Sequence, residues 1–294
     1  MKKSPVFLFS ILYLALLLLA SLTVSLFSNG SWNDSSMGEV LLTPNFHHWL
    51  GTDSLGRDLL LRILHGTQAS LLTALLAMVV ALFIGASLGV LSGWWGGIRD
   101  QALMRFVEVF LSFPQIVFIS LILITIRKQT GSLSQTEMVA SLVLAQALTS
   151  WMIFARIARN LVLQEKNKTY IEAATALGGT SLRILWYHIL PNIFSTLVVF
   201  AGLQVSNYIL FESFLSFVGV GFQPPLSSWG LLIQEGWRTL SVYPHLILAP
   251  SAVLFLTILS LNLIFESLLL RLNPKLKHHQ TLKRKKRISP SLTT

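Results

Sequence analysis

Six stretches of mostly apolar residues, each about 20 residues or longer, constrain this 294-residue chain more than any other feature. A helix needs about 20 such residues to cross the hydrocarbon core of a bilayer. Backbone amides in lipid must be hydrogen-bonded within the protein, so runs of this kind form helices. The sequence therefore predicts an all-α polytopic membrane protein with six transmembrane helices, over residues 6–28, 69–92, 102–126, 137–160, 191–216 and 244–270.

The first apolar run, Val6 to Phe27, follows Lys2 and Lys3, as in a secretory signal peptide. The run is longer than a usual signal-peptide core of about 7–15 residues, and no clear A-x-A cleavage site follows it. We therefore expect an uncleaved anchor. We assign residues 1–68 to this anchor and an outer segment, and residues 69–272 to the main transmembrane domain.

The positions of Lys and Arg predict the orientation. With the N-terminus inside, 17 of the 22 Lys and Arg residues fall in cytoplasmic segments and 5 in outer segments. This excess predicts that both termini and residues 161–190 are cytoplasmic in an inner (plasma) membrane protein. The net charge of +10 lies between and after apolar runs, which argues against a nucleic-acid-binding face. The tail, residues 273–294, is expected to be disordered and to hold the topology, with binding of anionic lipid as the alternative.

Small residues recur every four positions in the second apolar run. On a helix this spacing makes one narrow stripe that lets another backbone approach closely. We expect the stripe to pack within the subunit, and a seam with a partner subunit is the alternative. Its members are Ala77, Ala81, Gly85, Gly89 and Gly93.

A polar, alanine-rich segment, TYIEAATALGGTSLRILWYHILPN, separates the fourth and fifth apolar runs. Thr169 and Glu172 have the spacing of a capping box, which predicts a helix start. Gly178 is expected to end this helix with a positive φ. Thr180 or the serine after it can cap a second helix before Pro191 opens the fifth span. A helix of about two turns is marginal alone in water, so it must pack on its own subunit or on a partner.

The same segment resembles the EAA loop of binding-protein-dependent ABC importer permeases, a pattern close to EAA-x3-G-x9-I-x-L-P. His188 stands where isoleucine is usual, and "HILPN" is similar to the peptide/nickel branch. Three further stretches resemble that branch in the family's order: HWLGTDSLGRDLL (48–60), LSFVGVGFQPPLSSWG (215–230) and LLRLNPKL (269–276). Nearly the whole chain thus resembles the C-type permease of oligopeptide, dipeptide and nickel importers.

This resemblance implies a permease subunit that forms half of a pathway for peptide uptake, with nickel or another small solute as the alternative. A second permease, two ATP-binding subunits that bind ATP and Mg, and an extracytoplasmic solute-binding protein are the implied partners. The EAA loop would be the coupling helix that docks on an ATPase subunit. The coupling residues it implies are Tyr170, Glu172, Ala173, Ala174, Leu177, Gly178, Leu190 and Pro191.

Polar groups inside the spans and turn residues after the fifth span are candidates for the transport path. Glu212 precedes a Gly/Pro-rich turn, and we expect this region to form an outer gate or a dock for the binding protein, with a purely structural loop as the alternative. Pro114 and Pro250 predict kinks. The turn candidates are Gly219, Gly221, Pro224, Pro225 and Trp229; the intramembrane candidates are Glu108, Gln115, Gln146, Gln204, Asn207, Asn262 and Glu266.

Motifs for catalysis are not found. GTDSLGRD (51–58) has the G-x4-G spacing of a phosphate-binding loop, but Arg57 and Asp58 replace the required Lys and Ser/Thr. H-E-x-x-H does not occur, and the one G-x-S-x-G match, GASLG (85–89), lies inside the second apolar run rather than at a strand-to-helix turn, so it does not predict a catalytic serine. The pairs His47-His48 and His278-His279 are expected to be solvated, and we predict no metal site. A stand-alone secondary transporter would need a complete pathway, often with an inverted repeat, and we see none.

Overall fold

The computed structural model describes residues 5–27, 33–36, 38–131 and 133–272. The predicted basic tail, with His278 and His279, lies outside the described residues. Within them, five helices are long and apolar enough to cross a membrane, and a sixth candidate span is a bent pair, α3 with α4. The elements are α1 (Pro5–Phe27), α2 (Leu59–Trp95), α3 (Gly97–Leu111), α4 (Gln115–Thr130), α5 (Gln135–Lys166), α6 (Thr169–Ala176), α7 (Ser181–Ile184), η2 (Leu185–Ile189), α8 (Leu190–Val218), α9 (Trp229–Trp237) and α10 (His245–Leu272).

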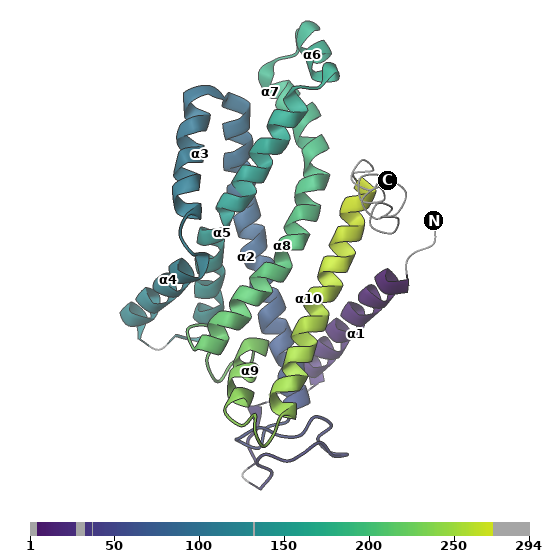
Figure 1. Ribbon diagram of the computed structural model, residues 1–294, viewed down its shortest axis with the longest axis vertical. Coiled ribbons are helices and arrows are strands. Elements are labelled where there is room, and N and C mark those ends of the chain that lie inside the picture. Colours follow the sequence, from purple (N-terminus) through teal and green to yellow (C-terminus); the bar gives the residue numbers. More distant parts are fainter. Residues whose placement is uncertain (1–4, 28–32, 37, 132, 273–294) are drawn as a thin grey trace, which may run out of the picture.

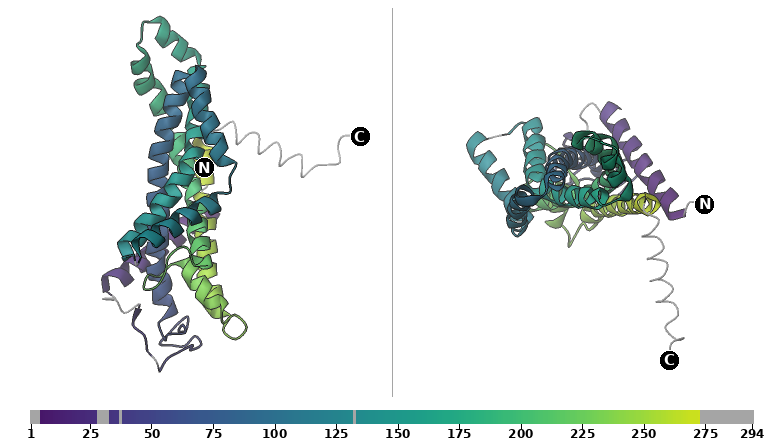
Figure 2. Two further views of the ribbon diagram at one scale, coloured as in Figure 1. Left: turned by 90° about the vertical axis from the view of Figure 1, so that its left-hand side faces the viewer. Right: turned by 90° about the horizontal axis from the view of Figure 1, so that it is seen from above.

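The long helices α2, α5, α8 and α10 run along the long axis of an elongated molecule (Figures 1 and 2). One end carries α6 and α7. The opposite end carries α9 and the segment between α1 and α2 (Figure 1). In Figure 1 the beginning of α1 and the end of α10 lie nearer to α6 than the opposite ends of the same two helices do. The prediction of an all-α membrane fold is confirmed.

Helix α2 packs most extensively along α5. The small-residue stripe of α2 is buried and lies in this interface. A Cβ at Gly85 would lie 2.7 Å from Cβ of Phe154, and one at Gly89 would lie 2.8 Å from the carbonyl carbon of Ala155. The two backbones therefore approach to a distance that only glycine permits at these positions. Because α2 already begins at Leu59, the assigned boundary between residues 68 and 69 falls inside this helix.

The third span is not one continuous helix, which corrects the expectation of a single helix over residues 102–126. Helices α3 and α4 meet at 82°. Pro114 stands at the N-cap of α4 and has no N–H to continue the ladder of α3. It also disfavours helical backbone at Phe113. The expected kink at Pro114 is therefore a break, whereas α10 continues as a helix through Pro250.

The fifth span begins earlier than predicted. The helix runs from α7 through a π-helical turn, η2, directly into α8. In η2 the N–H of Leu190 donates to the carbonyl of Leu185. Such a wide turn accommodates Pro191, which cannot donate a backbone hydrogen bond, without ending the helix.

Helix α1 packs against α2 and α10 with few buried side chains. The hydroxyl of Ser21 donates to the carbonyl of Leu64 on α2 (2.8 Å), and the hydroxyl of Tyr13 donates to the carbonyl of Val253 on α10 (3.2 Å). Most of its leucines are exposed, for example Leu8 (59%) and Leu19 (60%). This is the surface expected of a helix that faces lipid on most sides.

Candidate functional site

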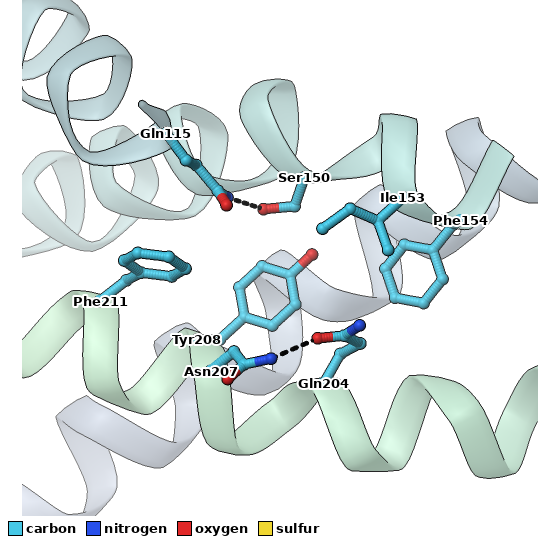
Figure 3. Close-up of a pocket in the computed structure, with 8 residues that line it drawn as sticks. All are labelled: Gln115, Ser150, Ile153, Phe154, Gln204, Asn207, Tyr208 and Phe211. Atoms are coloured by element: carbon cyan, nitrogen blue, oxygen red, sulfur yellow. Dashed lines mark hydrogen bonds between the residues drawn. The ribbon is translucent and has the colours of Figure 1, made fainter. Parts of the chain in front are cut away.

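A cavity of about 220 Å³ lies between the middle of α5, the middle of α8 and the first residue of α4. Ser150 is central in α5, Gln204 is the middle residue of α8, and Gln115 begins α4 after the break. The other lining residues are Ile153, Phe154, Asn207, Tyr208 and Phe211 (Figure 3).

The polar side chains of this cavity form two hydrogen-bonded pairs on opposite walls (Figure 3). The amide of Gln115 donates to the hydroxyl of Ser150 (2.7 Å), and the amide of Asn207 donates to the side-chain oxygen of Gln204 (2.5 Å). The hydroxyl of Ser150 in turn donates to the carbonyl of Gln146 (2.6 Å). The wall is therefore polar but uncharged.

Of the predicted intramembrane polar residues, the structure brings Gln115, Gln204 and Asn207 together at this cavity. Glu108 is elsewhere: it is exposed and forms a pair with Arg105 on the same helix, at 3.7 Å. The remaining candidates, Gln146, Asn262 and Glu266, do not line the cavity.

The polar segment after α5 folds as predicted at its end and not at its start. Helix α6 stops in a Schellman arrangement: the N–H of Gly178 donates to the carbonyl of Thr175 and that of Gly179 to Ala174, both at 3.0 Å. Gly178 has a φ of 84°, which confirms the positive φ expected there. The predicted start of α6 is wrong by one residue, and the predicted capping box does not form. The turn after α5 places Lys168 at the N-cap, so Thr169 is already helical and no side chain caps the helix. Thr180 stands at the N-cap of α7, also without a side-chain cap.

Only one residue of α6, Ile171, is buried. It packs in a cluster with Val162 of α5 and Ile184 of α7. The expected coupling residues Glu172, Ala173 and Leu177 are exposed, with Leu177 at 89%. The other expected members are exposed to different degrees: Tyr170 and Pro191 are exposed, while Ala174 and Leu190 are partly buried.

A groove of about 530 Å³ runs between α6, α7 and the end of α2. Lys166 extends along Trp94, 5.0 Å from its ring, and donates to the Trp94 carbonyl (3.0 Å). The Tyr170 hydroxyl donates to the Glu165 carboxylate and accepts from the Asn192 amide (2.8 Å). Burial and the Glu165 carboxylate raise the pKa of Tyr170. These bonds fix α6 to the ends of α5 and α8, while its outer face stays uncovered.

Glu212 lies at the other end of α8 and is completely buried. Its carboxylate accepts from the hydroxyl of Ser216 (2.8 Å), and the same hydroxyl accepts from the N–H of Phe222 (2.9 Å). Gly219 ends α8 with a φ of 90°. Gly221 fits against the backbone of Ser216, where a Cβ would meet the Ser216 Cα at 2.6 Å. Glu212 thus holds the turn onto α8.

The turn after α8 has a buried side and an exposed side. Trp229 is fully buried, and its backbone N–H donates to the hydroxyl of Ser70 (3.4 Å). Arg127 of α4 donates to the carbonyls of Gly219 (3.3 Å) and Gly221. Pro224 and Pro225 are exposed. Of the predicted outer residues, only these two prolines present an open surface for a partner.

Known proteins resemble this arrangement closely enough to assign a family. Residues 85–278 match the family described as binding-protein-dependent transport system inner membrane component. The chain belongs to this family. It is therefore the membrane-spanning permease subunit of an ABC importer, and the predicted resemblance is confirmed.

Three relatives of the permease illustrate the match. The glutathione transport system permease protein GsiD of Pectobacterium atrosepticum is 39% identical over 80% of this chain and 75% of its own length. The oligopeptide transport system permease protein OppC of Haemophilus influenzae is 37% identical, covering 85% and 76%. OppC of Bacillus subtilis is 31% identical, covering 91% and 85%. The inward-facing MetNI methionine ABC transporter shares the fold, with a TM-score of 0.55 at 20% identity over 72% of this chain and 96% of that one.

Sequence reasoning missed a buried ion network near the start of α2 in this permease. Arg62 is 1% exposed and contacts the carboxylates of Asp53 (2.5 Å) and Glu235. Arg57 donates to Asp53 (2.7 Å). The sequence DSLGRDLLLR marks three of these groups, but Glu235 on α9 is 173 residues from Arg62. The segment that fails as a phosphate-binding loop is thus a structural joint between α2 and α9.

One member of the first histidine pair differs from its predicted solvated state. The Nδ1 atom of His48 lies 2.7 Å from the carboxylate of Asp58, the N-cap of α2, and its Nε2 lies 3.6 Å from Glu39. His47 is exposed. Among the residues that the structure describes, no group of three His, Cys, Asp or Glu side chains could hold a metal ion.

Proposed function

We propose that this permease forms half of a pathway for peptide uptake and pairs with a related second permease. The relatives support the peptide substrate, since two are named for oligopeptides and one for glutathione, itself a tripeptide. The alternative substrate, nickel, has no counterpart among these three relatives.

Two separate ATP-binding subunits, which bind ATP and Mg, would drive the pathway through α6. The observation that carries this proposal is the exposed face of α6. A helix of eight residues is too short to be stable by itself in water. Within its own chain it is held by the buried Ile171 and by the hydrogen bonds of Tyr170, and the rest of its surface is exposed or partly buried. A partner groove that covers Glu172, Ala173 and Leu177 would supply the missing packing. Movement of the ATPase pair would then be passed through η2 into α8.

The end that carries α6 would face the cytoplasm, and we expect both termini on the same side, in keeping with the predicted excess of Lys and Arg there. The opposite end would face outward. There the exposed Pro224 and Pro225 offer a surface on which a solute-binding protein would dock. Glu212 and Trp229 would act from beneath, by holding the shape of this surface.

Substitution of Gly178 tests the coupling role of α6. Gly178→Val forces a β-branched residue into a left-handed conformation, which costs about 1–2 kcal/mol. A Cβ at Gly178 would meet no heavy atom within 4 Å, so a clash contributes nothing. Because the strain is confined to an exposed turn, we expect normal membrane levels, severely reduced peptide uptake and weaker copurification of the ATPase subunits in mild detergent.

Gly178→Asn is the matched control, since asparagine tolerates this conformation and should retain most of the uptake. Lys285→Ala in the basic tail should change little. Normal uptake by Gly178→Val at matched protein levels, or a loss caused only by degradation, would show that α6 is an ordinary loop helix.

A further inference from the structure

The cavity between α4, α5 and α8 lies at the middle of the long helices, far from both ends of the molecule. Ser150 and Gln204 are at the centres of their helices, so both lie near the bilayer midplane if these helices span it. The break before Gln115 is also at this level (Figure 1). Non-helical backbone at membrane depth is tolerated where it lines a cavity or is buried in protein.

The cavity is too small to be a complete binding site. Its volume is about 220 Å³, whereas sites for whole small molecules occupy about 300–1,000 Å³. Asn207, one of the residues that line it, is exposed. A half-site of this kind is expected where two permease subunits face each other across one pathway.

The chemistry of the lining is specific. Its hydrogen-bonding groups are amides and hydroxyls, and no carboxylate, imidazole or ammonium group lines it. Within the described part of the chain, the side-chain oxygens of Gln115 and Asn207 and the amide nitrogen of Gln204 have no hydrogen-bond partner. The cavity thus offers both donors and acceptors that are free for a ligand.

Two buried polar groups beside these amides are not fully hydrogen-bonded. Tyr208 is 3% exposed, and its hydroxyl, directed toward the Ser150 side of the cavity in Figure 3, interacts with the Ser150 hydroxyl without a hydrogen bond of good geometry. Gln146, one turn before Ser150, is fully buried, and neither polar atom of its amide is hydrogen-bonded within the described chain. Such groups cost free energy unless water or a ligand satisfies them.

We propose that Gln115, Gln204 and Asn207 form a subsite that hydrogen-bonds the peptide-bond amides of a passing peptide. This inference rests on the proposed function of peptide uptake. A peptide bond presents one N–H and one C=O, which the primary amides of glutamine and asparagine can both satisfy. Recognition of the backbone is independent of side-chain charge. A divalent cation would find none of the carboxylate, imidazole or thiolate ligands that hold such ions.

The test uses the complete importer, with its binding protein, in proteoliposomes. The probes are labelled tetra-alanine and the same peptide with methylated backbone nitrogens, which cannot donate. Uptake per ATP hydrolysed is compared between the wild type, the double variant Gln204→Leu/Asn207→Leu, and the control Asn262→Leu. Asn262 is a polar residue of α10 that does not line the cavity.

We expect the double variant to lose about tenfold or more in tetra-alanine uptake, since each lost hydrogen bond changes binding by about fivefold. It should keep its ATPase stimulation and should distinguish the two peptides less than the wild type does. Because the wild-type importer and the variant importer use the same binding protein, a change in discrimination between the two peptides is caused by the permease. If the double variant fails to assemble, Gln204→Met removes one amide at nearly constant length and should show a smaller loss of the same kind.

Unchanged uptake and discrimination in the assembled variants, or an equal loss in Asn262→Leu, would overturn the subsite. Failure of the proposed function has a different signature. In that case the wild type itself would import neither peptide, although its ATPase subunits respond to the binding protein.

Discussion

Replacement of Gly89 by alanine is expected to destabilise the interface between α2 and α5. The new Cβ would lie 2.8 Å from the carbonyl carbon of Ala155 and closer still to its oxygen, whereas ordinary contacts begin at 3.4 Å. The obstacle is backbone, so no side chain can rotate away. The helices must separate by roughly 1 Å, which weakens the neighbouring dispersion contacts. Overpacking costs about 1–3 kcal/mol or more, and the higher helix propensity of alanine returns at most about 1 kcal/mol.

Because the obstacle is backbone, the overpacking cost lies at its upper end, about 2–3 kcal/mol, and the net loss for Gly89→Ala is about 1–2 kcal/mol. Thermal unfolding in mild detergent, followed by tryptophan fluorescence, should show a midpoint lower by about 2–8 °C. Gly93→Ala should lower the midpoint less than Gly89→Ala does, because its Cβ would come only within 2.9 Å of the Arg159 carbonyl oxygen. Gly38→Ala, with no atom within 4 Å, should be neutral.

Equal midpoints for Gly89→Ala and Gly38→Ala would refute this reasoning. A second outcome would restore the alternative interpretation of the small-residue stripe. If Gly89→Ala leaves the isolated chain unchanged but releases the partner permease, the stripe is a seam between subunits.

Three further predictions address the topology, the ion network and the motor. Since the chain has no cysteines, single cysteines can be labelled without background: the exposed Gln223 should react from outside and Lys168 only from inside, and the reverse would overturn the proposed orientation. Asp53→Asn should cost about 3 kcal/mol, because it leaves two buried arginines to share the single carboxylate of Glu235, whereas Glu108→Gln in an exposed pair should shift the unfolding midpoint little; equal midpoints would contradict this. The purified chain alone should show no ATPase activity above background, and hydrolysis that survives removal of contaminating subunits would contradict a separate motor.

The spans could be predicted because hydropathy is a property of each segment by itself. Every predicted apolar run corresponds to a helix or, for the third, to a bent pair. Proline chemistry predicted a distortion at Pro114, but the 82° angle depends on how α4 packs against α5 and α8, which no local pattern encodes. The start of α6 was missed by one residue for a similar reason, since the turn that leaves α5 decides which residue becomes the N-cap.

The functional residues could also be predicted only in part, because local chemistry is visible in the sequence and contacts between distant residues are not. The cost of polar groups in lipid identified Gln115, Gln204 and Asn207 as candidates, but not that they share one cavity. The contact between Arg62 and Glu235 could not be found from spacing, because the two residues are far apart in the chain. By contrast, the end of α6 at Gly178 is encoded within a few residues and was predicted correctly.

The distribution of charge along the molecule explains why the central cavity is neutral. Apart from the exposed pair of Arg105 with Glu108 on α3, the ion pairs lie toward the two ends, for example Arg62 with its carboxylates near α9 and Lys168 with Glu165 (2.6 Å) beside α6. A charge at the bilayer centre is costly unless it is paired. If the pairing group were a ligand of opposite charge, the site would hold that ligand tightly. A transport path must bind its cargo well enough to admit it and weakly enough to release it. Amide hydrogen bonds, each contributing about 1 kcal/mol net, meet both conditions, and Gln204 and Asn207 supply them where the two halves of the membrane meet.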